Sequence, residues 1–437
     1  MGFDHAAIDF GTSNSAIVVP SSAGVPTLVE LEPGYRTMPT AVFYAAEPHE
    51  GGADRLYGRA AIDAYVEGWD GRLMRSMKSV LGSSLIGQAT DVGRGQAVRY
   101  VDVIAGYLRR LKHCAERHLG NPIDRVVLGR PVYFVDDDPA RDAQAQTALE
   151  AAARSVGFAE VRFQFEPIAA ALDHEQRVRT EQCVLVADIG GGTSDFSVVR
   201  IGPDRRQAQE RRDDILASHG VHIAGTDFDR RIELDAMMPL LGYRASGPAR
   251  PGEAPREVPS AVYFDLATWH LVNTVYAPAR VAELRGMLAF YGNPAHHARL
   301  MRVVEQRRGH ALVAAAEHAK IGVADQGEVD IDLACAETGL AARLSAAQAA
   351  EAIEADLARV VAAADETLRR ANLRGGDIDA VYFTGGSTGL RALADRIAER
   401  CPRAERVRGD RFASVAQGLG VHAARLFAAR RPGLADA

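Results

Sequence analysis

The stretch that decides the fold occurs twice along the chain. It reads AIDFGTSNSAIVV at residues 7–19 and VADIGGGTSDFSVV at residues 186–199. Each copy has an apolar strand with Asp near its end, a turn of Gly, Thr and Ser, and a second apolar strand. This pattern is typical of two strands joined by a tight turn. The repeat, about 180 residues apart, predicts two related lobes that face one ligand.

The glycine turns are suited to holding phosphate groups. Backbone N–H groups can point at a phosphate only where no side chain blocks the approach, and Gly also adopts the positive φ of tight turns. One turn contains Gly190, Gly191, Gly192 and Thr193, and the other contains Gly11, Thr12 and Ser13. Either turn alone could be an ordinary hairpin with solubilising Asp residues. Because the two match, phosphate binding is the favoured interpretation.

Three carboxylates lie in or beside these turns, at Asp9, Asp188 and Asp195. Carboxylates and phosphate repel each other at close range in a cleft of low dielectric constant. A divalent cation between them removes the conflict, and Mg²⁺ binds through one or two carboxylates together with phosphate oxygens. The sequence therefore predicts a magnesium–nucleotide complex as ligand, with Asp9 and Asp188 as candidate metal ligands.

Length and composition exclude several classes of protein. The 437 residues predict two or three domains. The net charge of −6 and the aromatic content of 6% give no footprint for nucleic acid. Four scattered Cys, no apolar run long enough to span a bilayer and no signal peptide lead us to expect a cytoplasmic protein without a membrane partner.

Strands alternate with helices along the chain, which favours α/β layers. We expect helices over residues 99–119, over residues 139–156 after the Asp136–Asp138 cap, over residues 344–371 with a Ser345 cap, and over residues 414–431. The arginines of residues 205–212 are balanced by nearby acids and predict a solvated hairpin tip. His296 and His297 are expected to face solvent, and His113 with His118 is not expected to bind a metal.

Five segments in this order resemble the nucleotide-binding domain of DnaK-type heat-shock chaperones, within the actin-like ATPase superfamily. They are Asp9–Ser15, Gly129–Phe134, Phe165–Leu172, Asp188–Asp195 and Gly385–Thr388. The Glu166-Pro167 pair, followed by small residues, is specific for the chaperone branch. The resemblance implies two lobes with duplicated cores around a nucleotide cleft: residues 1–182, with a small subdomain at about 36–100, and residues 183–437, with a small subdomain at about 226–325. The last helix is expected to return to the first lobe.

The resemblance also implies roles for individual residues. Lys78 would be the catalytic lysine, Asp188 would orient the attacking water, Thr193 would meet the γ-phosphate, and Glu166 would be a carboxylate near the metal. Asp9 would hold water on Mg²⁺. Pro131 and Arg141 would correspond to a relay toward a partner domain. The implied contacts to ATP or ADP come from Gly11, Thr12, Ser13, Asn14, Gly190, Gly191, Gly192, Gly225, Glu317, Lys320, Gly385, Gly386 and Ser387.

The adenosine end departs from the family pattern. Glu317 and Lys320 are present, but Ile321, Ala324 and Gly389 stand where the family has Arg, Ser and a second Arg. The adenine would lose two guanidinium contacts. We therefore expect weaker or less base-selective binding than in a full chaperone.

The expected function is that of a short chaperone-like ATPase without the peptide-binding domain, which hydrolyses ATP slowly and changes its lobe arrangement with nucleotide state. Two alternatives remain open: a nucleotide-binding interaction protein with little hydrolysis, and a small-molecule kinase of the same superfamily. Residues 242–300 are longer than the family pattern and are a candidate surface for a client or co-chaperone.

Overall fold

The computed structural model describes residues 4–21, 25–47, 54–93, 95–135, 138–206, 208, 210–248, 256–409 and 413–428. Several sequence expectations lie outside these residues: the caps Asp136 and Asp137, part of the candidate partner segment at 249–255, and the last three residues expected for the final helix. Contacts divide the chain into two compact units. Unit 1 comprises 1–221, 363–388 and 397–437, and unit 2 comprises 222–362 and 389–396.

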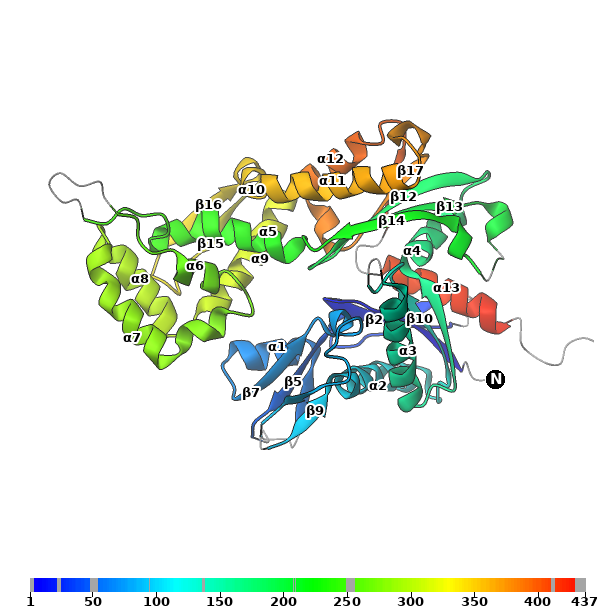
Figure 1. Cartoon of the computed structure of the whole chain (residues 1–437), viewed down its shortest axis with the longest axis horizontal. Coiled ribbons are helices and arrows are strands. Elements are labelled where there is room, and N and C mark those ends of the chain that lie inside the picture. The colour runs from blue at the N-terminus through cyan, green and yellow to red at the C-terminus, as the bar shows by residue number, and fades with distance from the viewer. Residues whose placement is uncertain are drawn as a thin grey trace, which may run out of the picture. The chain divides into compact units, whose positions relative to one another are not determined.

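Unit 1 contains two main sheets of the same topology (Figure 1). The first has the order β11-β10-β1-β2-β3, and the second has the order β18-β17-β12-β13-β14. In both, a central strand pairs antiparallel with the next strand in the chain and parallel with a later one, as β1 does with β2 and β10, and β12 with β13 and β17. The repeated sequence therefore forms a repeated fold.

The strands of both sheets are short and largely buried. In the first sheet they are β1 (His5–Phe10), β2 (Asn14–Val19), β3 (Thr27–Leu28), β10 (Arg125–Arg130) and β11 (Glu160–Phe165), and β4 (Met38–Pro39) also pairs with β2. In the second they are β12 (Gln182–Ile189), β13 (Ser194–Ile201), β14 (Ile215–Val221), β17 (Ala380–Thr384) and β18 (Glu405–Arg408).

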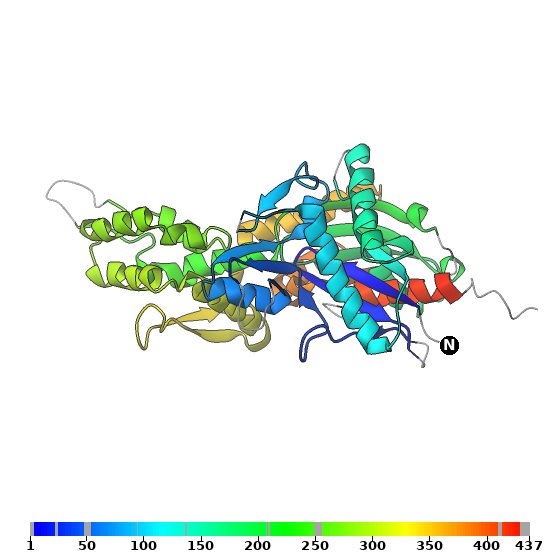
Figure 2. The same ribbon diagram turned by 90° about the horizontal axis from the view of Figure 1, so that it is seen from below.

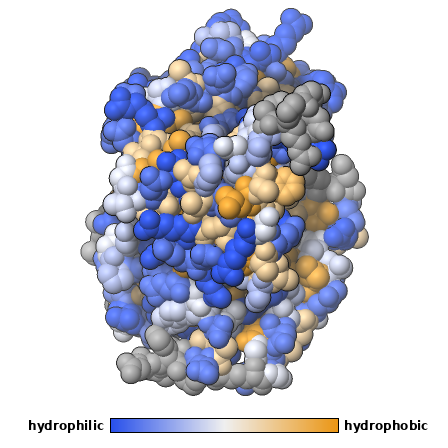
Figure 3. Space-filling model, turned by 90° about the vertical axis from the view of Figure 1, so that its left-hand side faces the viewer, coloured by the Kyte–Doolittle hydropathy of each residue, from blue (hydrophilic) through white to orange (hydrophobic). Residues whose placement is uncertain are grey.

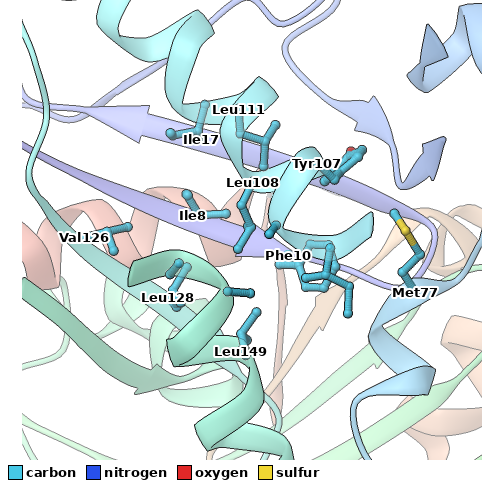
Figure 4. Close-up of a cluster of buried hydrophobic side chains, with 14 of the residues drawn as sticks. Ile8, Phe10, Ile17, Met77, Tyr107, Leu108, Leu111, Val126, Leu128 and Leu149 are labelled. Carbon is cyan, nitrogen blue, oxygen red and sulfur yellow. The ribbon is translucent and has the colours of Figure 1, made fainter. Parts of the chain in front are cut away.

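Helices cover the two faces of the first sheet (Figure 2). The helices α2 (Tyr100–Leu119) and α3 (Pro139–Ser155) pack on one face, where Ile8, Phe10 and Leu128 meet Leu108 and Leu149 (Figure 4). On the other face, α4 (Glu166–Glu175) and α13 (Ser414–Ala428) share a core with both sheets. A Cβ at Gly418 would overlap the Ala169 carbonyl, so only Gly permits this approach of α13 to α4.

A smaller part of unit 1 follows β4. It contains β5 (Ala41–Ala45), β6 (Arg55–Tyr57), α1 (Gly58–Val66), β7 (Gly71–Arg75), the 3₁₀ turn η1 (Met77–Val80) and the hairpin β8 (Ala89–Asp91) and β9 (Ala97–Arg99). Met77 is buried in the core shared with Phe10 and Tyr107 (Figure 4), and this fixes the start of η1.

Unit 2 is mainly helical. It contains α5 (Gly225–Ile232), a π-helical turn η4 (Glu233–Met237), η5 (Met238–Leu241), α6 (Ala261–Leu266), η6 (Val272–Tyr276), α7 (Pro278–Gly286), η7 (Met287–Phe290), α8 (Pro294–Glu305), α9 (Gly309–Gln326), the hairpin β15 (Glu328–Asp332) and β16 (Ala341–Ser345), and α10 (Ala346–Ala352). The first half of α11 (Glu354–Arg370) also belongs to it.

Some local expectations are confirmed. Asp138 caps α3 by accepting a hydrogen bond from the Arg141 backbone N–H, and Pro139 is the first helical residue. Ser345 caps a helix through Gln348. The prediction of a single helix over 344–371 is wrong. Leu344 belongs to strand β16 and pairs with Val329 of β15, and the chain then forms two helices separated at Ile353.

Two predictions of exposure are also wrong. Arg211, expected on a solvated tip, is buried and pairs with Glu175 and Asp214. His297 is buried, and its Nε2 donates to the Leu284 carbonyl. Glu175 is 36 residues from Arg211, and Leu284 is 13 residues from His297, so local sequence did not reveal these partners. Only Asp214 is a local partner, three residues from Arg211.

Candidate functional site

Three loops of unit 1 meet at the ends of the central strands. The turn after β1 and the turn after β12 are in contact, because a Cβ at Gly191 would lie only 2.5 Å from Ser13 Oγ. The third loop follows β17, and the Ser387 hydroxyl donates to the Gly190 carbonyl over 2.7 Å. The structure thus brings together the three glycine loops that the sequence singled out.

In the first and third loops the backbone requires Gly. A Cβ at Gly11 would overlap the Asn14 carbonyl, and Gly385 has φ +85° with the Ile189 carbonyl against it. The Gly190 N–H donates to the Thr193 carbonyl over 3.0 Å and closes the second turn. Among the described residues, none lies within 4 Å of the Cβ position of Gly192, and Gly386 begins the turn η9 (Gly386–Gly389). Small residues leave the backbone accessible, as a phosphate site requires.

Thr40 fastens the first loop and was not identified from the sequence. Its backbone N–H donates to the Ser13 carbonyl over 2.9 Å, and its hydroxyl donates to the Gly11 carbonyl over 2.8 Å. The hydroxyl also contacts Ser15 Oγ at 2.8 Å. Asn14 begins β2 and pairs with Pro39 beside it. Thr12 lies in the turn between Gly11 and Ser13. The Pro39-Thr40 segment therefore sets the shape of the loop.

A lysine and a carboxylate from distant segments form an ion pair in the same unit. Lys78 Nζ donates to Glu166 Oε1 over 2.6 Å, and both side chains are about seven-eighths buried. Lys78 is carried by η1 and Glu166 is the first residue of α4. Burial lowers the pKa of the Lys78 ammonium, but the charges of Glu166, Asp9 and Asp195 outweigh it and raise the pKa overall.

The aspartates expected at the metal face this lysine. Burial, followed by the charge of Glu166, raises the pKa of Asp9 to about 7 even though Lys78 opposes the shift. Burial, followed by the charges of Asp195, Glu166 and Asp9, raises the pKa of Asp188 to about 8. Each aspartate keeps some accessible surface. The site therefore groups more carboxyls than its one lysine can neutralise, and their raised pKa values reflect this crowding.

This donor set fits a hydrated magnesium ion rather than a cation caged by protein. Among the described residues, no three His, Cys, Asp or Glu side chains are grouped closely enough to hold a metal ion by themselves. Mg²⁺ keeps several waters and takes one or two carboxylates. Asp9 and Asp188 would hold it, and their mutual repulsion would be relieved by its charge.

The residues expected at the ribose belong to unit 2. Lys320, on α9, is buried, and its Nζ lies 2.7 Å from Asp229 Oδ1 and donates to the Gly225 carbonyl over 3.1 Å. Glu317 is exposed on the same helix, and Ile321 is half exposed. Burial raises the pKa of Asp229 to about 6, although Lys320 opposes the shift. Asp229 was not identified from the sequence, where only its place four residues after Gly225 could have suggested it.

The two residues expected to form a relay, Arg141 and Pro131, have the following contacts. Arg141 Nη2 donates to the Gly82 carbonyl over 2.5 Å, just after the turn that carries Lys78. Pro131 follows β10 and its carbonyl accepts from Arg130 Nε over 3.0 Å.

Within the described part of the chain, no helix combines the length and apolar character needed to cross a bilayer.

Comparison with known proteins identifies the family of this site. The family model for Hsp70 protein matches residues 5–235 and 300–431, which is most of the chain and includes all the loops above. The chain belongs to the Hsp70 family. It therefore has the actin-like ATPase fold, and its matched part corresponds to a DnaK-type nucleotide-binding domain.

Curated Hsp70 relatives match about half of this chain. It is 33% identical over 226 residues to the chaperone protein DnaK of Thermosipho melanesiensis, which covers 52% of this chain and 34% of the relative. It is 30% identical over 246 residues to the chaperone protein dnaK of Cyanidioschyzon merolae, which covers 52% of this chain and 37% of the relative. The chain thus matches about a third of the length of each, and residues 236–299 lie outside the Hsp70 family match.

Proposed function

We propose that this Hsp70-family chain binds ATP and ADP with Mg²⁺, hydrolyses ATP slowly and acts as a nucleotide-dependent chaperone switch. The observation that supports it best is the meeting of three glycine loops beside the Lys78–Glu166 pair and the uncompensated aspartates. The loop N–H groups would bind the phosphates, and bound Mg²⁺ would neutralise phosphate charge. Phosphoryl transfer of this kind depends on positioning and electrostatics rather than on a covalent nucleophile.

Each protein group has a defined part in this proposal. Lys78 would stabilise negative charge that develops on the γ-phosphate, and Glu166 holds its ammonium in place. Asp188 would accept a hydrogen bond from the attacking water and orient it. Thr12, Ser13 and Thr193 would contact phosphate oxygens. In unit 2, Glu317, Lys320 and Gly225 would bind the ribose.

Titration calorimetry with ATP and ADP, with and without Mg²⁺, tests binding, and phosphate release in a single turnover tests hydrolysis. Lys78→Ala should bind nucleotide but hydrolyse it far more slowly. Lys112→Ala is a matched control, because Lys112 is equally buried and pairs with Glu116 over 2.6 Å outside the loops. Failure of the unaltered chain to bind any nucleotide in the presence of Mg²⁺ would refute the proposal.

The same measurements separate the alternatives. An interaction protein with little hydrolysis would bind nucleotide, and its very low hydrolysis rate would be the same in Asp188→Ala as in the unaltered chain. ATP consumption that requires a sugar or an organic acid would favour a small-molecule kinase. Small-angle scattering of the ATP and ADP states tests the nucleotide-dependent change of lobe arrangement, which requires different contacts to the ligand in the two states.

We propose that the candidate partner surface lies within residues 242–300, of which 242–299 fall outside the family match. Three large apolar side chains are exposed there, on Phe264, Leu288 and Phe290. Figure 3 faces this side of unit 2 and shows apolar residues bordered by hydrophilic ones. A run of consecutive exposed apolar residues, as at 288–290, is unusual unless it has a function. Leu288→Ser with Phe290→Ser should abolish binding of a client or co-chaperone without changing nucleotide affinity.

A cytoplasmic location is part of the proposal. It is supported by the four cysteines, Cys114, Cys183, Cys335 and Cys401, which are all free thiols. Free thiols are typical of reducing compartments. Fractionation of the source cells with an antibody to the chain would test the location.

A further inference from the structure

Aromatic and guanidinium groups stack next to the Lys78–Glu166 pair, within unit 1. The Arg130 guanidinium carbon lies 5.2 Å from the ring centres of both Phe134 and Phe165. The Arg212 guanidinium carbon lies 5.2 Å from the Phe165 ring centre and 5.5 Å from that of Tyr133. Phe165 is therefore held by two arginines through cation–π contacts.

Arg130 is the better anchored of the two arginines. It is 8% exposed, and its Nη2 donates to both carboxylate oxygens of Asp142 over 3.1 and 2.8 Å and to the Val132 carbonyl over 3.2 Å. It also donates to Gln146 and to the Pro131 carbonyl. Asp142 accepts in addition from the Phe134 backbone N–H over 2.6 Å. The guanidinium therefore ties the segment after β10 to α3.

Phe165 connects this anchor to the carboxylate that holds the lysine. In the parallel pairing of β10 with β11, Arg130 is the register partner of Phe165. Phe165 is the N-cap of α4, and Glu166 is the next residue. Gly129, the residue before Arg130, leaves room for Glu166, because a Cβ there would lie 3.3 Å from both Glu166 Cγ and Glu166 Oε1. A shift of the Arg130 segment or of Phe165 would move the Glu166 carboxylate directly.

We propose that Arg130 is a positioning residue for the Lys78–Glu166 pair, acting through Phe165. It makes no direct contact with either residue among the interactions above, so its effect depends on the ring that it holds. The inference rests on the proposed function for its consequence in ATP hydrolysis. Its structural part concerns the protein alone and can be tested without nucleotide.

The test uses the scarcity of lysine in this chain. Only Lys78, Lys112 and Lys320 are present, and each pairs with a carboxylate. Acylation with an amine-reactive ester, followed by mass spectrometry, gives the reaction rate of each lysine in one sample without ligand. In Arg130→Met, the Lys78 rate should rise about fivefold relative to Lys112, which corresponds to a loss of about 1 kcal/mol in the ion pair. In Arg130→Lys the Lys78 rate should rise similarly, because one ammonium cannot replace the separate contacts of Nε, Nη1 and Nη2 or the stack on Phe165.

Arg125→Met is the matched control. Arg125 lies on the same strand, pairs with Asp4 and stacks on Phe427 at 4.9 Å. It is at the opposite end of β10 from Arg130, where its register partner is Glu160 rather than Phe165. It should lose stability without changing the Lys78 rate. Phe165→Leu provides a second route, because it removes the stack and keeps the Arg130–Asp142 contact. It should expose Lys78 as Arg130→Met does.

Equal acylation of Lys78 in the unaltered chain and in folded Arg130→Met and Phe165→Leu would overturn the inference. A uniform rise of all three lysines would also overturn it, since that indicates general loosening. In the ATPase assay, Arg130→Met should lower kcat and leave KM unchanged. If the unaltered chain binds no ATP, the proposed function fails while the acylation result still decides the role of Arg130.

Discussion

Lys78 Nζ lies 2.6 Å from Glu166 Oε1, although the two residues are 88 positions apart in the sequence. The pair joins the turn after β7 to the first residue of α4 and faces Asp9 and Asp188. Removing the ammonium leaves several buried acids without a cation. Lys78→Ala should therefore reduce the single-turnover rate of ATP hydrolysis about 10²–10³-fold, as the loss of a charge-stabilising donor does in other enzymes. An unchanged rate would contradict the role of Lys78.

The contact between the first two glycine loops gives a second prediction. Gly191→Ala places a methyl group 2.5 Å from Ser13 Oγ, so the Ser13 side chain must move away from this contact. We expect weaker ATP binding by titration calorimetry, with little change in stability because Ser13 can move. Gly192→Ala is the control, because its Cβ position has open space around it. Equal affinities of the two variants would show that the loop contact is unimportant.

Gly385 should tolerate no side chain. It has φ +85°, and a Cβ would overlap the Ile189 carbonyl, which is fixed backbone. Gly385→Ala should lower the free energy of unfolding by about 1–3 kcal/mol, the cost of a strained backbone conformation. Urea unfolding measures this change. Gly327→Ala has a similar φ of +83° without a neighbour, so the difference between the two variants isolates the steric part.

Glu233 should make unit 2 less stable as pH rises. It is fully buried in the π-helical turn, and neither carboxylate oxygen has a hydrogen-bond partner among the residues that the structure describes. Burial, with a further contribution from Asp229, raises its pKa well above the ordinary value. The folded state therefore keeps the proton while the unfolded state loses it. The contribution of Glu233 to stability is therefore fully present below about pH 4.5 and is lost as pH rises toward the folded pKa.

Thermal unfolding at pH 5, 6 and 7 measures this effect. Glu233→Gln removes the titration and should flatten the decline, whereas Glu233→Asp keeps a titrating group and should retain it. Asp229, whose pKa is about 6, adds a decline of the same sign in every variant. A Glu233→Gln profile as steep as that of the unaltered chain would contradict the prediction.

The base-binding end offers a gain-of-function prediction. Ile321 is 51% exposed on α9, one residue after Lys320, and Ala324 follows one turn later. Ile321→Arg with Ala324→Ser would restore a guanidinium for stacking and a hydroxyl for hydrogen bonding. Cation–π contacts of about 0.5–2 kcal/mol would tighten ATP binding about 2- to 30-fold. Competition between ATP and GTP measures the gain in affinity and in base selectivity. Tight, adenine-exclusive binding by the unaltered chain would contradict the expectation that its base site is weak.

Much of the fold could be predicted from short stretches of sequence. The doubled Asp and glycine pattern predicted two hairpins, and these form β1–β2 and β12–β13 of two sheets with the same topology. Caps such as Asp138 and Ser345 could be identified because the backbone N–H that donates to the cap side chain lies three residues later. The division of the chain into lobes and the roles of the site residues stay predictions.

What the sequence determined by itself was local: which segments form strands, turns and capped helices, and which glycines leave backbone free. Only the tertiary structure decided which charged groups are buried and which partners they have. Arg211 meets Glu175 across 36 residues, Thr40 fastens Gly11 across 29, and Lys320 meets Gly225 across 95. The physical reason is that a charge or hydroxyl is stabilised by whatever lies within hydrogen-bond reach, and folding brings together groups that no sequence spacing connects.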